Sequence, residues 1–484
     1  MQYTSTRDDT VSADASAAIL TGLAPDGGLF VPTSFPALDV TECYGLSYSE
    51  TAQKVLQLFL SDYDSAFLQE AVTQTYSDAN FDGKAGFVKK ISDDRFALEL
   101  WHGPTCAFKD YALQLMPKLL CEAKKLQKDT GMTKILVATS GDTGKAALAG
   151  YANLSGIKIA VFYPNDGTST MQRLQMATQE GDNVAVYAVN GNFDDAQRGV
   201  KCAFADGTLA ASLAQKGETL SSANSINWGR LVPQIVYYFY SYAQLVAQKE
   251  ITSGSAVSFC VPTGNFGDIL AGYYAKQMGL PIDKLICASN TNNVLTDFLE
   301  TGIYNANRTF YKTTSPSMDI LVSSNLERLL YHITKDSAQV AAWMQQLATD
   351  GQYVVSPDIL QKIQETFDCG FANDEDVSNQ IAKQMVQNHY LCDPHTAVAF
   401  LVAERTDIAA PCVVLSTASP YKFAGDVLFA MGEPVPEDAF AAMDALQAKT
   451  GLPIPKSLAA LQQKKVRFTQ TIQAQSIVQI AHDF

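Results

Sequence analysis

The segment ILVATSGDTGKAALAGYANL, residues 135–154, decides the fold class of this chain. Its first five residues are apolar or β-branched, as in a short buried strand. A glycine-containing turn follows at residues 140–144, and the alanine-rich stretch at residues 145–154 favours a helix. A strand that leads through a glycine turn into a helix is the first half of a βαβ unit.

The same alternation of strand and helix signals continues after this segment. The expected strands are residues 158–163, 184–189, 256–261 and 284–288, and the expected helices are residues 171–179, 193–204, 230–247 and 268–278. This order predicts an α/β fold with open parallel sheets that helices cover on both faces. Such sheets bind ligands at the carboxyl ends of their strands, where the glycine turns lie.

The regular alternation occupies the middle of the chain, and the two ends differ from it. The length of 484 residues alone predicts roughly three domains. The pattern instead favours two α/β domains with flanking parts. We expect an N-terminal segment at residues 1–95, α/β domains at residues 96–250 and 251–430, and a proline-containing C-terminal tail at residues 431–484.

Acidic residues outnumber basic ones, and this argues against one large class of partners. The chain has 35 Lys and Arg against 50 Asp and Glu, so its formal net charge is −15. Nucleic acids are bound by clustered basic residues, and the densest cluster here is the short stretch KKVR at residues 464–467. We therefore expect no nucleic-acid partner. The hydrophobic share of 47% is typical of a globular chain rather than a disordered one.

The sequence also predicts where the protein works. No apolar run reaches the roughly 18 residues that a membrane helix needs, so we expect no membrane partner. The nine cysteines are scattered and form no CxxC pair, which is typical of reduced thiols in the cytoplasm. Cys392 and His395 come nearest to metal-ligand spacing, but two ligands do not make a site, so no metal is expected.

Lys109 is the first candidate for catalytic chemistry. It lies in HGPTCAFKD, residues 102–110, directly after Phe108 and at the start of an expected helix. Apolar surroundings lower the pKa of a lysine, and a neutral amine can form a Schiff base with an aldehyde. A solvated surface lysine at a helix start is the alternative interpretation.

Two glycine turns are candidates for binding anions. Glycines let the backbone come close to a ligand, and the amides at a helix start suit a carboxylate or a phosphate. The first turn supplies Ser140, Gly141, Asp142 and Thr143, and the second supplies Gly264, Asn265, Phe266 and Gly267. The second turn lacks the lysine of a nucleotide-binding P-loop, so it suits a single phosphate. An ordinary helix cap and a tight turn are the respective alternatives.

Thr417 follows the expected strand at residues 412–415. Its hydroxyl can hydrogen-bond an unprotonated ring nitrogen, although a simple turn at the strand end would look the same. Together the four features are compatible with a pyridoxal-phosphate site. Lys109 would hold the aldehyde, the second glycine turn the phosphate, Thr417 the ring nitrogen, and the first glycine turn the carboxylate of an amino acid.

At this point the chain resembles a known family, the threonine synthases of the fungal and bacterial long-chain type. The motifs that carry the resemblance occur in order over nearly the whole chain: YTSTR (3–7), HGPTCAFKD (102–110), SGDTGKAA (140–147), NSINWGRLVPQ (224–234), PTGNFGD (262–268), DPHTAVA (393–399) and STASPYKF (416–423). One departure is the sequence at residues 419–421, Ser-Pro-Tyr, where related chains often have His-Pro-Ala.

The resemblance implies a pyridoxal-phosphate enzyme of fold type II that converts O-phospho-L-homoserine and water to L-threonine and phosphate. It implies that Lys109 is the Schiff-base lysine, that the second glycine turn holds the cofactor phosphate, and that Thr417 contacts the pyridine nitrogen. It also favours a monomer. The cation for the substrate phosphate stays open among Lys422, Arg173 and Lys145. A serine or threonine dehydratase and a non-catalytic cofactor-binding protein are the alternative functions.

Overall fold

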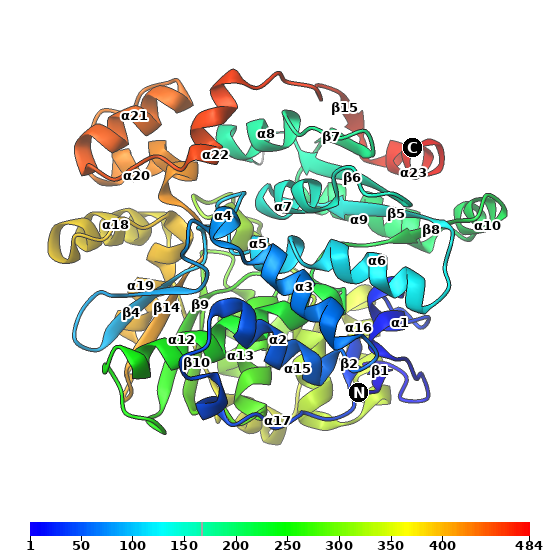
Figure 1. The fold of residues 1–484 in the computed structure, drawn as a ribbon, viewed down its shortest axis with the longest axis horizontal. Helices are drawn as coiled ribbons and strands as arrows, with labels where there is room; N and C mark the ends of the chain where they lie inside the picture. Colours follow the sequence, from blue (N-terminus) through cyan, green and yellow to red (C-terminus); the bar gives the residue numbers. More distant parts are fainter. Residues whose placement is uncertain (166–167) are drawn as a thin grey trace.

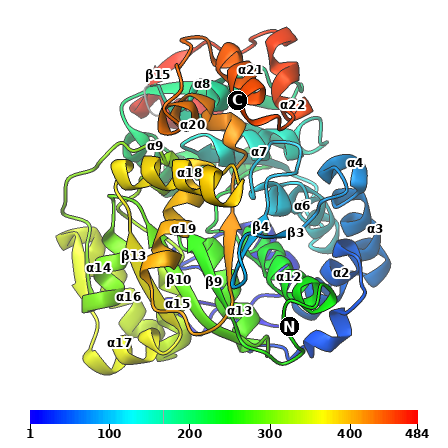
Figure 2. The same cartoon turned by 90° about the vertical axis from the view of Figure 1, so that its left-hand side faces the viewer.

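The computed structural model describes residues 1–165 and 168–484, and its strands form two large sheets (Figure 1). The larger sheet has six strands in the order β13 (Phe367–Phe371), β10 (Ile282–Ser289), β9 (Val257–Pro262), β14 (Cys412–Ser416), β4 (Arg95–Glu99) and β3 (Phe87–Lys90). All neighbours in it are parallel except β3 and β4. The sheet lies in the lower half of Figures 1 and 2.

The second sheet has five strands, all parallel, and lies in the upper half of both views. Its order is β15 (Thr471–Gln473), β7 (Val184–Asn190), β6 (Ile157–Pro164), β5 (Met132–Ala138) and β8 (Glu218–Ser221). Alternate residues of β5 face opposite layers: Ile135 and Val137 join the core with α7 (Asp142–Tyr151), while Leu136 and Ala138 join the core with α9 (Phe193–Ala205). The predicted α/β fold with parallel sheets is confirmed.

Helices cover both sheets and connect their strands (Figures 1 and 2). In the part with the five-stranded sheet these are α6 (Met116–Leu126), α8 (Thr170–Ala177), α10 (Gly207–Gln215) and α23 (Ile477–Asp483). In the part with the six-stranded sheet they are α12 (Ile235–Ala247), α13 (Gly267–Gln277), α14 (Val294–Thr301), α15 (Leu326–Thr334), α16 (Ser337–Asp350), α17 (Pro357–Gln364), α18 (Asp374–Asn388) and α19 (Pro394–Arg405). The tail adds α20 (Ala424–Ala430), α21 (Ala439–Thr450) and α22 (Lys456–Ala459).

The N-terminal segment forms a small unit against these layers. Its strands β1 (Tyr3–Ser5) and β2 (Phe30–Pro32) pair with each other, and its helices are α1 (Ala15–Thr21), α2 (Tyr48–Phe59) and α3 (Ser65–Thr75). The fully buried Arg328 of α15 donates from Nε to the carbonyl of Phe30 at 3.0 Å, so this segment is fastened to the larger part of the molecule. Among the described residues, no helix combines the length and the apolar character needed to cross a bilayer.

The prediction of one helix is wrong in where the helix starts and in treating it as unbroken. The expected helix at residues 230–247 is broken into α11 (Trp228–Leu231), a 3-10 turn (Val232–Gln234) and α12. The reason is Pro233, which has no backbone N–H and whose ring clashes with the preceding helical turn. This break sets the geometry around Arg230, which faces the cavity described below.

The chain crosses between the two sheets more often than the expected domain boundaries suggest. β3 lies in the expected N-terminal segment, and β4 lies in the expected domain at residues 96–250 except for its first residue, Arg95, yet both strands belong to the six-stranded sheet. The chain then builds most of the five-stranded sheet, returns for β9 to β14, and ends with β15 on the edge of the five-stranded sheet. The two sheets are thereby tied together at both ends of the chain. The four expected parts stay a prediction.

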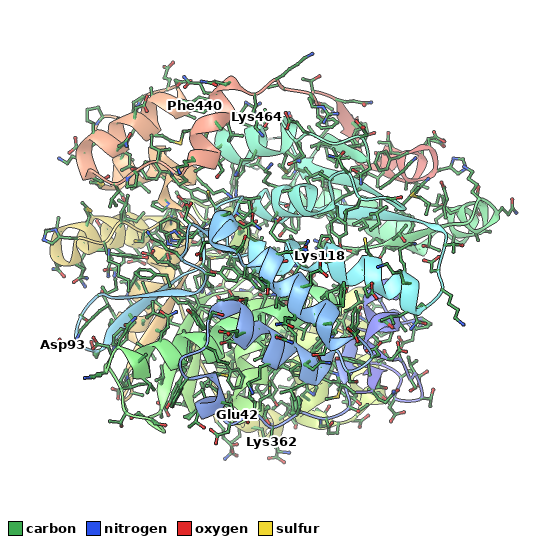
Figure 3. All side chains as sticks on the ribbon, viewed as in Figure 1. Glu42, Asp93, Lys118, Lys362, Phe440 and Lys464 are labelled. Atoms are coloured by element: carbon green, nitrogen blue, oxygen red, sulfur yellow. The ribbon has the colours of Figure 1, made fainter. Side chains whose placement is uncertain are left out.

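Side chains fill the space between these layers, and labelled charged residues lie at the periphery (Figure 3). Glu42 at the lower edge, Asp93 at the left and Lys464 at the top are all exposed. The surplus of acidic residues is therefore compatible with a packed interior, because most charged side chains remain in water.

Candidate active site

A cavity lies between the two sheets, at the carboxyl ends of β9 and β14. Residues from all four predicted stretches line it: Lys109, Asp142, Thr143, Gly264, Asn265, Phe266, Gly267 and Thr417. Strand ends of open α/β sheets are where such sites are expected. The fold therefore brings together groups that are far apart in the sequence, such as Lys109 and Thr417, which are separated by 308 positions.

Lys109 lies at the start of the short helix α5 (Asp110–Leu113), with its Nζ 4.4 Å from the ring centre of Phe108. Desolvation lowers the pKa of Lys109 to about 8, and the nearby cation of Arg230 adds to this effect. The amide of Phe108 donates to the carbonyl of Thr417 at 2.8 Å, so the lysine segment is fixed to the end of β14. Lys109 is thus a partly buried residue of the cavity, and its catalytic role stays a prediction.

The glycine turn between β9 and α13 is open toward the cavity. Its carbonyl groups are held on the protein side: Ser323 Oγ donates to Gly264 O at 2.8 Å, and Asn325 donates to Asn265 O at 3.0 Å. Phe266 has a φ of +60°, a left-handed conformation that turns successive amides in one direction. No acceptor among the described residues takes a hydrogen bond from the four amides of residues 264–267.

The glycine turn between β5 and α7 is closed. Thr139 Oγ1 accepts from the amides of Gly141 and Gly144, each at 2.9 Å. Asp142 Oδ1 lies 2.5 Å from Lys422 Nζ and accepts from Gln172 at 2.7 Å. Burial would raise the pKa of Asp142, but the ammonium groups of Lys422 and Lys109 outweigh it and hold that pKa well below its usual range.

The four residues of this closed turn do not all line the same cavity. Asp142 and Thr143 line the cavity, whereas Ser140 lines a neighbouring one next to Gly191, Asn192 and Phe193. Gly141 lines neither, because the side chain of Gln172 fills the space beside it. A substrate role for all four residues stays a prediction.

Thr417 is buried and lines the cavity, and its amide donates to Thr396 Oγ1 at 3.3 Å. Tyr421, the departure noted in the sequence, is not among the cavity residues. Its hydroxyl donates to the carbonyl of Leu452 at 2.5 Å, so this ring fastens the C-terminal tail. The tyrosine is thus explained by packing.

Several groups of the cavity were not found from the sequence. Arg230 is buried, its Nη1 donates to Ala223 O at 2.6 Å, and its Nε has no partner among the described residues. Burial lowers the pKa of Arg230 to about 10. His395 and Ser317 also line the cavity. The motifs NSINWGR and DPHT contain Arg230 and His395, but neither shows that these side chains would face Lys109.

Asp268 is a further cavity residue that the sequence left unexplained. It follows the open glycine turn, and Tyr237 and Tyr238 direct their hydroxyls to its Oδ1. Its Oδ2 is buried and has no partner among the described residues. Burial raises the pKa of Asp268 to about 7, and Lys109 opposes that shift.

These groups fit pyridoxal phosphate. The close approach at Gly264, where a Cβ would lie 2.8 Å from Ser317 O, leaves room only for glycine beside the open amides. Three buried polar atoms of the cavity residues have no partner within residues 1–165 and 168–484, namely Arg230 Nε, Asp268 Oδ2 and Ser317 Oγ. Amides and a hydroxyl suit a phosphate, Lys109 suits an aldehyde, and Thr417 suits a ring nitrogen. The residues present can therefore hold the cofactor.

His395, which together with Cys392 came nearest to metal-ligand spacing in the sequence, is hydrogen-bonded at both ring nitrogens. His395 Nδ1 pairs with Asp393 Oδ2 at 2.7 Å, and its Nε2 accepts from the amide of Ser317 at 3.1 Å. Within the described residues no group of three or more potential metal ligands occurs.

Three family models match successive parts of the chain: "Threonine synthase N terminus" at residues 2–76, "Pyridoxal-phosphate dependent enzyme" at residues 86–417, and "Threonine synthase, C-terminal" at residues 396–480. The threonine synthase of Pseudomonas aeruginosa is 39% identical, over 87% of this chain and 89% of that protein. The human protein named threonine synthase-like 1 is 41% identical over 86% of this chain. The chain spans 58% of the length of that relative.

Solved structures agree with the family models. The pyridoxal-phosphate-bound threonine synthase from Brucella melitensis superposes with a TM-score of 0.86 at 37% identity, covering 100% of both chains. The yeast threonine synthase gives a TM-score of 0.86 at 33% identity, over 99% of this chain and 97% of that one. The chain therefore has fold type II and belongs to the threonine synthase family of pyridoxal-phosphate-dependent enzymes.

Proposed function

We propose that this protein is a threonine synthase that converts O-phospho-L-homoserine and water to L-threonine and phosphate. The observation that carries the proposal is that one cavity contains a partly buried lysine of lowered pKa and a separate cradle of open amides. The first can form a covalent bond to an aldehyde, and the second can bind a phosphate. Bound pyridoxal phosphate supplies the electron sink that acidifies the bonds at the substrate's α-carbon.

Lys109 is the group that moves protons. Its pKa of about 8 leaves part of the population neutral near pH 7, so Nζ can accept a proton from a substrate carbon and return it later. The ring centre of Phe108 lies 4.4 Å from Nζ, and the lysine is partly buried. Both α- and β-protons of the substrate must pass through a base in this reaction, and Lys109 lies in the position to serve for both.

The remaining residues bind and orient. The amides of Gly264, Asn265, Phe266 and Gly267 would hold the cofactor phosphate. Thr417 offers a hydroxyl rather than a carboxylate to the pyridine nitrogen, so this nitrogen would stay largely neutral. Thr143 is the member of the closed turn that offers the substrate a hydroxyl facing the cavity, since the carboxylate of Asp142 is held by Lys422.

The cation for the substrate phosphate is best supplied by Arg230. Arg230 lines the cavity, and its buried Nε has no partner among the described residues. The three cations expected from the sequence are less suited: Lys422 is paired with Asp142, Lys145 donates to Gln179 at 2.5 Å, and Arg173 is exposed and is not a cavity residue. The assignment of Arg230 in place of these three residues is part of the proposal.

We infer that the protein acts on this small molecule as a cytoplasmic monomer, without a nucleic-acid partner. All nine cysteines are free thiols, which supports a reducing compartment. The net charge of −15 argues against a nucleic-acid partner. Because substrate and cofactor are both anions, the overall charge opposes their approach, and binding must depend on the local amides and cations.

The decisive experiment measures threonine and phosphate together. The purified protein, loaded with pyridoxal phosphate and given O-phospho-L-homoserine, should form both products in equal amounts. Rapid deamination of serine without release of phosphate from O-phospho-L-homoserine would identify a β-eliminating enzyme instead. Cofactor binding without any turnover of O-phospho-L-homoserine would identify a binding protein.

A further inference from the structure

Asp393 is a buried carboxylate near the cavity that the proposed chemistry does not use. It caps the N-terminus of α19 and is fully buried. Its two oxygens serve different neighbours: Oδ2 accepts from His395 Nδ1 at 2.7 Å and from the His395 amide at 3.0 Å, whereas Oδ1 accepts from the amide and the hydroxyl of Thr396. A plain helix cap needs only one of these oxygens.

A first chain of hydrogen bonds, called the first arm, leads from Asp393 through His395 to Ser317, which lies beside Gly264 in the open glycine turn. Because Nδ1–H donates to the carboxylate, Nε2 carries no proton and can accept from the Ser317 amide at 3.1 Å. The carbonyl of Ser317 lies 2.8 Å from the place that a Cβ of Gly264 would take. Ser317 Oγ is buried, has no partner among the described residues, and belongs to a residue of the cavity. The imidazole of His395 thus fixes the position of the Ser317 backbone against Gly264, the first residue of the turn proposed to bind the phosphate.

The second arm runs from Asp393 through Thr396 to the other end of the site. The hydroxyl of Thr396 donates to Asp393 Oδ1, which leaves its lone pairs free to accept from the amide of Thr417 at 3.3 Å. Thr417 in turn accepts at its carbonyl from the amide of Phe108, next to Lys109. This arm fixes the backbone from which the Thr417 hydroxyl faces the cavity.

We propose that Asp393 is a positioning residue that holds both ends of the cofactor site at once, the phosphate cradle through His395 and Ser317, and the ring-nitrogen contact through Thr396 and Thr417. The inference rests on the cofactor placement in the proposed function. A carboxylate is required because four donors converge on it. An amide in its place would turn an N–H group toward another donor and force His395 into the tautomer that cannot accept from Ser317.

The test separates the two ends by comparing pyridoxal phosphate with pyridoxal, which lacks the phosphate. Equilibrium binding to the cofactor-free protein and the absorbance maximum of the loaded protein are measured for both ligands. His395→Leu should weaken the binding of pyridoxal phosphate about tenfold relative to the binding of pyridoxal, because the buried hydrogen bond that holds Ser317 is lost. Thr396→Val should leave that ratio unchanged and shift the absorbance maximum with both ligands. Asp393→Ala removes both oxygens and should do both.

Conservative variants distinguish the loss of one hydrogen bond from a general loss of folding. His395→Gln places an acceptor near the position of Nε2 and should restore much of the ratio, whereas His395→Asn is too short and should not. Thr396→Ser keeps the hydroxyl and should keep the wild-type spectrum. Equal loss of both ligands in His395→Leu, or equal ratios in the Gln and Asn variants, would show that Asp393 only caps a helix. These readouts need no turnover, so a protein that binds normally but makes no threonine refutes the proposed function alone.

Discussion

Two glycine turns of this protein share the same local design and differ in what they can bind. Each joins a parallel strand to a helix, and each places an aspartate in the first turn of that helix, Asp142 in one and Asp268 in the other. In the turn before α7 the protein's own groups take the amides of Gly141 and Gly144. In the turn before α13 the amides stay open. Glycines at a helix start therefore do not by themselves mark a ligand site.

The two aspartates show the same contrast in their ionisation. Asp142 is paired with Lys422 and has a pKa well below its usual range. Asp268 meets only hydroxyl groups at Oδ1, and burial raises its pKa to about 7. The closed turn is held by an internal ion pair and leaves Thr143 at the cavity, whereas the open turn leaves its amides free beside a poorly compensated carboxyl.

The largest effect is expected at Lys109, which lies beside both aspartates. Lys109→Ala should remove the visible absorbance band of lysine-bound cofactor and lower threonine formation by at least about 10³-fold, because the proton-transfer group is lost. Lys145→Ala is the matched control, since burial also lowers the pKa of Lys145 to about 8 although it does not line the cavity. A Lys109 variant that keeps the band and the turnover would sink the assignment.

The closed turn should matter for stability. Lys422→Met leaves the buried Asp142 unpaired and should lower the free energy of unfolding by about 3–5 kcal/mol, and the double variant with Asp142→Leu should recover much of this loss. Denaturant titration measures both. The exposed pair of Arg405 and Asp376 is the control, and its removal should cost about 0–1 kcal/mol. A loss no larger than that control would mean that the turn is not closed in solution.

The open turn should matter for cofactor binding. Gly264→Ala puts a Cβ 2.8 Å from the carbonyl of Ser317, and overpacking of this kind costs about 1–3 kcal/mol, so pyridoxal phosphate should bind roughly tenfold more weakly. Gly267→Ala is the control, because its Cβ would meet no atom closer than 3.4 Å. Equal dissociation constants for the two variants would contradict the cradle described here.

The smallest effect concerns pH. Attachment of pyridoxal to the cofactor-free protein needs neutral Lys109, so its rate should rise with pH and level off above about 8. Ionised Asp268 stabilises the ammonium form of Lys109 and thereby raises its pKa. Asp268→Asn should therefore move the midpoint of the rate profile to lower pH, by a fraction of a unit. Stopped-flow absorbance checks this, and an unchanged midpoint would place Asp268 too far away to act.

The sequence was sufficient for the features that depend on neighbouring residues. Alternating apolar runs and glycine turns predicted parallel sheets, because strand and helix periodicity are local. Lys109, the turn at residues 264–267 and Thr417 were found because each follows a recognisable strand end or motif. The broken helix at Pro233 was missed although its proline is a local signal, since the apolar pattern continues across it.

Other features were decided by the tertiary structure alone. That β4 and β15 exchange between the expected parts depends on pairing between distant strands. The pairing of the Asp142 carboxylate in the closed turn depends on Lys422, which is 280 residues from it. The partnerless Nε of Arg230 and the two arms of Asp393 are likewise results of packing. The sequence determines which groups can bind an anion or a proton. The tertiary structure decides which of these groups are already hydrogen-bonded or ion-paired within the protein, because such pairing depends on burial and on distance in space.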